Sequence, residues 1–195
     1  MTPADAKTGQ CRPAGGVRAP ARRERGFTLM EVMVVAGIIA IAAAVATPGY
    51  MSRLPEIRAN GAARALLTDL QLARMQAVSE NIEYTVTFST AGNSYNVHRV
   101  PDNPELVKTV SLSDHFPGIE FGHVSGTDPD GSPISGSVTF EGNPPSVTFS
   151  PTGLAGSGYI FIKPSADTSR TDRQRAVGVR PSGRARLYAF KDGWQ

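Results

Sequence analysis

The sequence has 195 residues, with 20 basic and 17 acidic side chains and a single cysteine. A chain of this length can bury one core of ordinary size. One cysteine excludes a disulfide within the chain, so its stability must come from packing.

The first predicted element is an apolar helix near the N-terminus. Residues 27–47 would form a helix about 31 Å long, which is enough to cross the hydrocarbon core of a bilayer. Basic residues precede this run, and one acid, Glu31, lies near its start. A carboxylate inside a membrane costs free energy, so Glu31 is expected to have a function and a partner. The segment therefore predicts a membrane anchor with a functional glutamate.

Two other interpretations of this segment stay open. A secretory signal peptide has the same order of basic and apolar residues, and residues 44–46 (AVA) would serve as its cleavage site. The mature chain would then be a secreted soluble β protein that begins at Thr47. A plain signal anchor is the second alternative. Both leave Glu31 without a role, and the signal peptide does not explain a helical pattern that continues past Pro48.

The hexapeptide at positions 26–31, GFTLME, resembles the type IV prepilin and pseudopilin signature. In that family an inner-membrane aspartyl peptidase cuts after the glycine and methylates the new N-terminus. The resemblance implies processing at Gly26 and Phe27. It also implies that Glu31 pairs with the N-terminal amine of a neighbouring subunit during filament assembly. Pro48 falls where the long pilin helix bends or melts, and a proline inside a helix removes a backbone hydrogen bond.

Cleavage after Gly26 would remove a leader of 26 residues, which is longer than most in the family. The leader contains Cys11 and six of the basic residues, so the mature chain has 14 basic and 15 acidic side chains. Positive flanks stay cytoplasmic. We therefore expect a single-pass protein of the bacterial inner membrane, with its globular part in the periplasm and later in a pilus or pseudopilus filament.

The helical pattern continues through residues 49–81. Its apolar positions recur at spacings of four and three, at Ala59, Ala63, Leu66, Leu70, Ala73 and Ala77. This stripe predicts a helix face that packs under a sheet. The segment also resembles the GspH/FimT branch of the family, in which an arginine and an alanine precede the first strand. Arg74 and Ala77 match that pair.

Residues 82–195 predict a β domain. Runs of β-branched and aromatic residues alternate with Gly, Pro, Asn and Asp. The expected strands are residues 83–89, 94–100, 106–112, 137–140, 146–149, 158–163, 176–179 and 184–190. Short strands with no helical pattern between them favour antiparallel sheets.

The predicted fold class is α+β and type IV pilin-like. A long N-terminal helix, transmembrane in its first half, would pack on an antiparallel β-sheet domain. The expected parts of the chain are a prepilin leader at 1–26, the transmembrane helix at 27–48, its periplasmic half at 49–81 and the β domain at 82–195.

Two tetrapeptides share a turn pattern, at residues 150–153 (SPTG) and 180–183 (RPSG). Each has Pro at the second position and Gly at the fourth, which suits a type I turn. The first belongs to VTFSPTG, which resembles the Phe-x-Pro-x-Gly element of the GspH/FimT domain. We interpret both as structural turns.

The C-terminal segment is basic within an otherwise acidic chain. Residues 163–195 carry eight basic and three acidic side chains, whereas residues 27–162 carry six and twelve. This asymmetry suggests that one region meets a polyanion. Strand alternation would place Arg184, Arg186 and Tyr188 on one face. Successive arginines on that face would lie about 6.7 Å apart, a spacing suited to backbone phosphates.

Residues 183–186, GRAR, match the Gly-Arg-x-Arg element of FimT-type minor pilins that bind DNA. The resemblance implies that Arg184 and Arg186 contact double-stranded DNA, and Arg180, in the same basic segment, is a further candidate DNA contact. The alternative is that these arginines are a charged strand edge that discourages aggregation.

We predict no catalysis, no cofactor and no metal site. His98, His115 and His123 lack the spacing of metal ligands, and the Asp-Pro-Asp-Gly run at 128–131 is typical of a turn. The predicted function is a structural minor pilin or pseudopilin of the GspH/FimT family. Its partners would be other pilin or pseudopilin subunits, the prepilin peptidase and the inner membrane. Two possibilities stay open: a type II secretion pseudopilin that contacts proteins, and a type IV pilus component that also captures DNA.

Overall fold

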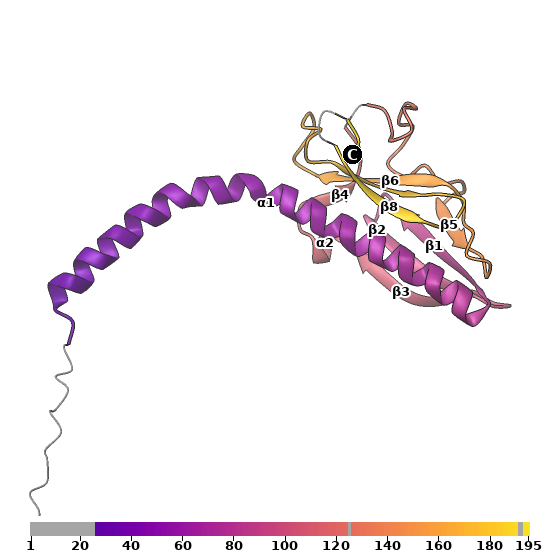
Figure 1. Ribbon diagram of the computed structural model, residues 1–195, viewed down its shortest axis with the longest axis horizontal. Helices are drawn as coiled ribbons and strands as arrows, with labels where there is room; N and C mark the ends of the chain where they lie inside the picture. The colour runs from indigo at the N-terminus through magenta and orange to yellow at the C-terminus, as the bar shows by residue number, and fades with distance from the viewer. Residues whose placement is uncertain (1–25, 125, 191–192) are drawn as a thin grey trace, which may run out of the picture. The chain divides into compact units, whose positions relative to one another are not determined.

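The computed structural model describes residues 26–124, 126–190 and 193–195, with only the backbone described at Pro48 (Figure 1). The predicted leader lies outside the described residues, apart from Gly26. The chain divides into two units, residues 1–44 and 45–195. The helix α1 (Leu29–Glu80) begins in the first unit and ends in the second.

The first turns of α1 are apolar and exposed. The span Leu29–Thr47 is long and apolar enough to cross a membrane, by length and composition. The backbone of α1 is helical on both sides of Pro48 and through it. The bend expected at Pro48 stays a prediction.

The second unit consists of two four-stranded antiparallel sheets and the remainder of α1. The first sheet has the order β3-β2-β1-β5, formed by β1 (Glu83–Ser89), β2 (Ser94–Val100), β3 (Glu105–Ser111) and β5 (Ser146–Phe149). The second has the order β4-β6-β7-β8, formed by β4 (Ile119–Phe121), β6 (Gly158–Pro164), β7 (Arg175–Val179) and β8 (Ala185–Ala189). A single helical turn, α2 (Leu112–His115), follows β3.

The core confirms the helix stripe that the spacing predicts. All six positions from Ala59 to Ala77 are at most 1% exposed. They belong to one apolar cluster with side chains of both sheets, including Val86, Phe88, Ile160 and Val177. One face of α1 therefore closes the core over both sheets, which is the α+β arrangement that the sequence indicates.

Three features differ from the sequence predictions. Residues 137–140 are not a strand, because Val138 forms a single bridge to Ile160 while Phe140 turns inward and stacks on Phe88, with ring centroids 5.9 Å apart. The short strand β4 and the helical turn α2 were not predicted. Three residues between Gly118 and Gly122 carry too little alternation to identify a strand.

The second half of α1 lies between the edge strands β3 and β8. On the β3 side, Nζ of Lys108 lies 2.8 Å from both carboxylate oxygens of the buried Asp69, and the Tyr95 hydroxyl donates to Asp69 at 2.7 Å. Burial, and then the bond to Asp69, raise the pKa of Tyr95. On the β8 side, α1 contacts the turn between β7 and β8 through Arg74. The two flanks of the helix thus meet different sheets.

Candidate functional site

The N-terminal motif forms the capped first turn of α1. Gly26 and Phe27 precede the helix and are exposed, with Phe27 at 80%. The Thr28 hydroxyl accepts a hydrogen bond from the backbone N–H of Glu31 at 3.2 Å. Glu31 lies in the first turn, where the helix dipole favours a negative charge. The predicted cleavage motif, an exposed carboxylate and an apolar helix therefore follow one another within a few residues.

The capping role of Thr28 was missed from the sequence, although its signal was present. Thr28 and Glu31 have the Ser/Thr-x-x-Glu spacing of a capping box, in which the first side chain bonds the N–H three residues later. The bond uses the backbone N–H of Glu31, so it leaves the carboxylate available for its expected role in assembly. The cap and the carboxylate can be separated by mutation.

Both predicted turns are confirmed. The N–H of Gly153 donates to the carbonyl of Ser150 at 2.8 Å, and the N–H of Gly183 donates to the carbonyl of Arg180 at 2.8 Å. Gly153 and Gly183 have φ values of +78° and +70°. A left-handed glycine directly after a type I turn is a common way to close a three-residue hairpin loop.

Arg74 ties these two turns to α1. Its Nε donates to the carbonyl of Gly153 at 3.0 Å and its Nη2 to the carbonyl of Ser182 at 3.2 Å. The turns also bond each other, because the N–H of Ala155 donates to the carbonyl of Pro181 at 3.1 Å. We call Arg74 and these two turns the turn clamp. The arginine that matches the GspH/FimT pattern therefore has a definite structural purpose.

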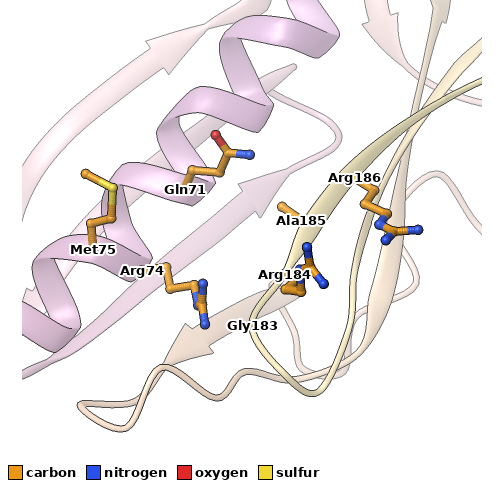
Figure 2. A pocket seen from close by; sticks show the side chains of 7 residues that line it. All are labelled: Gln71, Arg74, Met75, Gly183, Arg184, Ala185 and Arg186. Carbon is orange, nitrogen blue, oxygen red and sulfur yellow. The ribbon is translucent and has the colours of Figure 1, made fainter.

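A groove of about 310 Å³ runs between α1 and the β8 hairpin (Figure 2). Its lining residues are Gln71, Arg74, Met75, Gly183, Arg184, Ala185 and Arg186. Figure 2 shows Arg74 extending from the helix toward Gly183. Three arginines and no carboxylate line this groove, so it favours an anion.

Arg180, the third predicted DNA contact, is paired with a carboxylate. Its Nη1 and Nη2 lie 3.1 and 2.7 Å from the two carboxylate oxygens of Asp130. The Tyr159 hydroxyl also donates to Asp130, at 2.6 Å. Tyr159 and then Arg180 hold the pKa of Asp130 below its ordinary value, and Asp130 in turn raises the pKa of Arg180. A phosphate would have to displace Asp130 to reach this guanidinium.

Most of the C-terminal basic residues are neutralised in the same way. Carboxylates pair with five of them, in Lys163–Glu120, Arg170–Asp172, Arg173–Asp167, Arg175–Glu56 and Arg180–Asp130. Arg173 and Arg175 also bond α1, through the carbonyl of Ser52 and the side chain of Asn60. Lys191 lies outside the described residues. Within the part of the chain that the structure describes, Arg184 and Arg186 are the basic residues of this segment without such a partner.

The arrangement of β8 agrees with the predicted alternation. Ala185 and Leu187 pack against the main core, whereas Tyr188 belongs to the outer cluster around Tyr159 and Phe161. Arg184 and Arg186 are exposed; Arg184 directly precedes the edge strand β8, and Arg186 lies in it. Their geometry is compatible with a polyanion and with a charged strand edge, so DNA contact stays a prediction.

The long N-terminal helix, the antiparallel sheets and the motif at its start together define the class of type IV pilin-like proteins. Residues 62–183 match the family model for type II transport protein GspH, and residues 21–47 match the prokaryotic N-terminal methylation motif. Because the first match covers more than half of the chain, the chain belongs to the GspH family.

Solved structures of similar fold include the minor pseudopilin EpsH from the type 2 secretion system of Vibrio cholerae. One EpsH structure is 16% identical, with a TM-score of 0.50, and the match covers 68% of this chain and 97% of EpsH. A second is 14% identical, with a TM-score of 0.51 and coverages of 70% and 96%. The minor pilin FimU of Pseudomonas aeruginosa also matches, at 15% identity, coverages of 66% and 90% and a TM-score of 0.45. A comparison with curated proteins found no match. The likeness to EpsH shows a common fold.

Proposed function

We propose that this chain is a minor pilin or pseudopilin, a structural subunit of a type II secretion pseudopilus or a type IV pilus. The observation that supports this function is Glu31. It is the one charged residue in the span Leu29–Thr47, and it lies in the exposed first turn of that apolar helix, next to the cleavage motif. A signal peptide or plain anchor has no use for a carboxylate at this position.

The proposed sequence of events follows from the chemistry of this turn. Cleavage after Gly26 creates a new amine at Phe27, and α1 anchors the subunit in the inner membrane with residues 49–195 in the periplasm. An unpaired carboxylate in hydrocarbon is costly, and the cost is relieved when a cation of a neighbour approaches. The protonated N-terminal amine of an adjacent subunit would supply that cation, so Glu31 would favour the assembled state.

The mass of the mature chain tests this proposal. We expect membrane-extracted protein from its native host to begin at Phe27 and to carry one methyl group there, and Gly26→Val to retain the leader. A mature chain that begins at Thr47 would identify a signal peptide and would contradict the proposal.

A second candidate function is capture of double-stranded DNA, as in a FimT-like component. It is favoured by Arg184 and Arg186, which are exposed and have no carboxylate partner within the described residues. Phosphate contacts through these arginines would give affinity without base specificity. Arg180 would contribute less, because Asp130 already neutralises it.

A salt series tests DNA capture. We expect the soluble fragment 53–195 to bind double-stranded DNA with an affinity that falls as salt rises. Arg184→Ala/Arg186→Ala should lower the slope of that dependence by about two, because two phosphate contacts are lost. Arg53→Ala/Arg64→Ala removes the same charge from exposed positions on α1 and should leave the slope unchanged. Equal slopes for both double variants would remove the DNA role of this arginine pair.

A further inference from the structure

Three arginines lie on the face of the β7–β8 hairpin that is turned away from the main core. Val179 pairs with Ala185, and both side chains pack in that core. Because side chains alternate along a strand, the next pair, Arg180 and Arg184, lies on the opposite face. The N–H of Arg180 donates to the carbonyl of Arg184 at 3.1 Å, so the two segments are still paired at this point. Arg186 follows two residues later on the same face, and we call the surface around the three guanidinium groups the hairpin face.

A loop that precedes β5, residues 126–134, covers the same side of the second sheet, and we call it the strap. Its Ile134 packs in the outer aromatic cluster, which is separate from the main core and includes Tyr188 of β8. The strap also bonds the C-terminal residues, because Nε1 of Trp194 donates to the carbonyl of Thr127. Tyr188 alternates with the core-facing residues of β8 in the same phase as the arginines. The strap therefore packs beside the hairpin face.

Asp130 joins the strap to the hairpin face. Its carboxylate accepts hydrogen bonds from Nη1 and Nη2 of Arg180, at 3.1 and 2.7 Å, and from the Tyr159 hydroxyl at 2.6 Å. A phosphate group also presents two oxygens to the two nitrogens of a guanidinium. The side chains of Arg180 and Asp130 are 47% and 44% exposed, and exposed ion pairs are weak enough to exchange partners. Asp130 thus occupies the place that a phosphate would take on this arginine.

We propose that Asp130 is an internal competitor for the phosphate groups of a polyanion. In the free chain it neutralises Arg180 and leaves two arginines of the hairpin face available. A phosphodiester backbone that contacts Arg184 and Arg186 then displaces Asp130 from the third arginine, and the strap loses its attachment to the hairpin. This competition rests on the second candidate function, capture of double-stranded DNA, and adds a regulation of that site. DNA capture is then weaker than three arginines would allow, and it is coupled to a movement of the strap.

The competition predicts that removing the charge of Asp130 strengthens DNA binding. We expect the full chain with Asp130→Asn, in neutral-detergent micelles, to bind a short DNA duplex about fivefold more tightly at low salt, because Arg180 is then free. The slope of affinity against salt should become steeper by about one, since one more phosphate is contacted. Asp172→Asn is the matched control. It removes a carboxylate of similar exposure from a pair with Arg170, which precedes β7 whereas the hairpin follows it, and should leave the slope unchanged.

Release of the strap has a signal of its own, because Trp194 is the only tryptophan in the chain. Trp194 bonds the strap at Thr127 and lies against Phe161, with ring centroids 5.7 Å apart. We expect DNA to increase the quenching of Trp194 fluorescence by acrylamide, since a released strap no longer shields the indole. Asp130→Asn should show the increased quenching before DNA is added. Quenching that DNA lowers or leaves unchanged would overturn the release of the strap.

Tyr159→Phe provides a second variant, in which the packing of the strap is preserved. It removes one of the hydrogen bonds that hold Asp130 in place but keeps the aromatic ring in the outer cluster. It should bind DNA about twofold more tightly than the unsubstituted chain, because Asp130 is then easier to displace. A gain in this variant would come without any change in net charge.

The DNA measurements can also overturn the proposal. Equal gains for Asp130→Asn and Asp172→Asn would show that net charge alone decides the affinity. Unchanged affinity and slope in a folded Asp130→Asn chain, checked by circular dichroism, would identify Asp130 as a structural contact and leave DNA capture standing. Absence of DNA binding by both the unsubstituted chain and Asp130→Asn would overturn the competition and DNA capture together. The proposed subunit function would still stand in that case if Phe27 is methylated.

Discussion

Replacing Gly183 with alanine should destabilise the β domain by about 3–5 kcal/mol. Gly183 has φ +70°, and an added Cβ would overlap the carbonyl oxygen of Gly153 and lie 2.7 Å from Nε of Arg74. The carbonyl belongs to the backbone of the other turn, so the turns must separate. The Arg74 hydrogen bonds that join them to α1 would be lost as well. Urea unfolding of the fragment 53–195, followed by circular dichroism, measures the loss.

Gly118→Ala is the matched control for Gly183→Ala. Gly118 also has a left-handed backbone, with φ +80°, but no atom lies within 4 Å of its added Cβ. The Gly118→Ala variant should have a free energy of unfolding about 1–2 kcal/mol lower than the unsubstituted protein, because alanine is strained in a left-handed backbone conformation. Equal losses for the two variants would show that the turn clamp does not restrict Gly183, and would contradict the role assigned to Arg74.

Glu31→Ala should nearly abolish incorporation into filaments while leaving processing after Gly26 intact. The carboxylate is the one charge in the span Leu29–Thr47, so without it the neighbour's amine would enter the apolar layer unpaired. Glu31→Gln should be incorporated as poorly as Glu31→Ala, although glutamine, three residues after the N-cap, still suits a capping box. Recovery of the variants in sheared or purified filaments, compared with their methylated amount in membranes, measures the effect.

Thr28→Val separates assembly from helix capping. It removes the hydroxyl that accepts from the N–H of Glu31 but keeps the carboxylate. A lost cap costs about 1 kcal/mol of helix stability, so Thr28→Val should still be incorporated. If Thr28→Val were excluded from filaments as completely as Glu31→Ala, the loss of the helix cap rather than the loss of the charge would explain the failure of incorporation. Normal incorporation of Glu31→Ala would remove the proposed assembly role altogether.

The sequence predicts best where a local pattern repeats. Alternation over seven residues located β1 and β2 with their observed bounds, and spacings of three and four identified six buried positions of α1, although Ala62 and Asp69 are buried there as well. Such periodic signals depend only on which face is buried. The three-residue β4 and the single turn α2 are too short to show a period, and both were missed.

Pairings between distant residues could not be predicted from spacing. Arg74 bonds residues 79 and 108 positions later, and Arg180 bonds Asp130, 50 positions earlier. Counting charges in residues 163–195 therefore overestimated the cationic surface. The count includes guanidinium groups that carboxylates from other parts of the chain neutralise. What stays available is a smaller feature, the exposed pair Arg184 and Arg186.

The polar ties along α1 also determine how the β domain would bear mechanical load. Ser52, Asn60, Asp69, Arg74 and Glu80 each bond a side chain or carbonyl from the sheets and their turns. Between Ser52 and Glu80 these ties extend over about 42 Å of helix. Tension along the helix axis would shear them together instead of peeling them off one after another. A force that pulls on the helix would thus be shared among all of these hydrogen bonds, over the whole length of the domain.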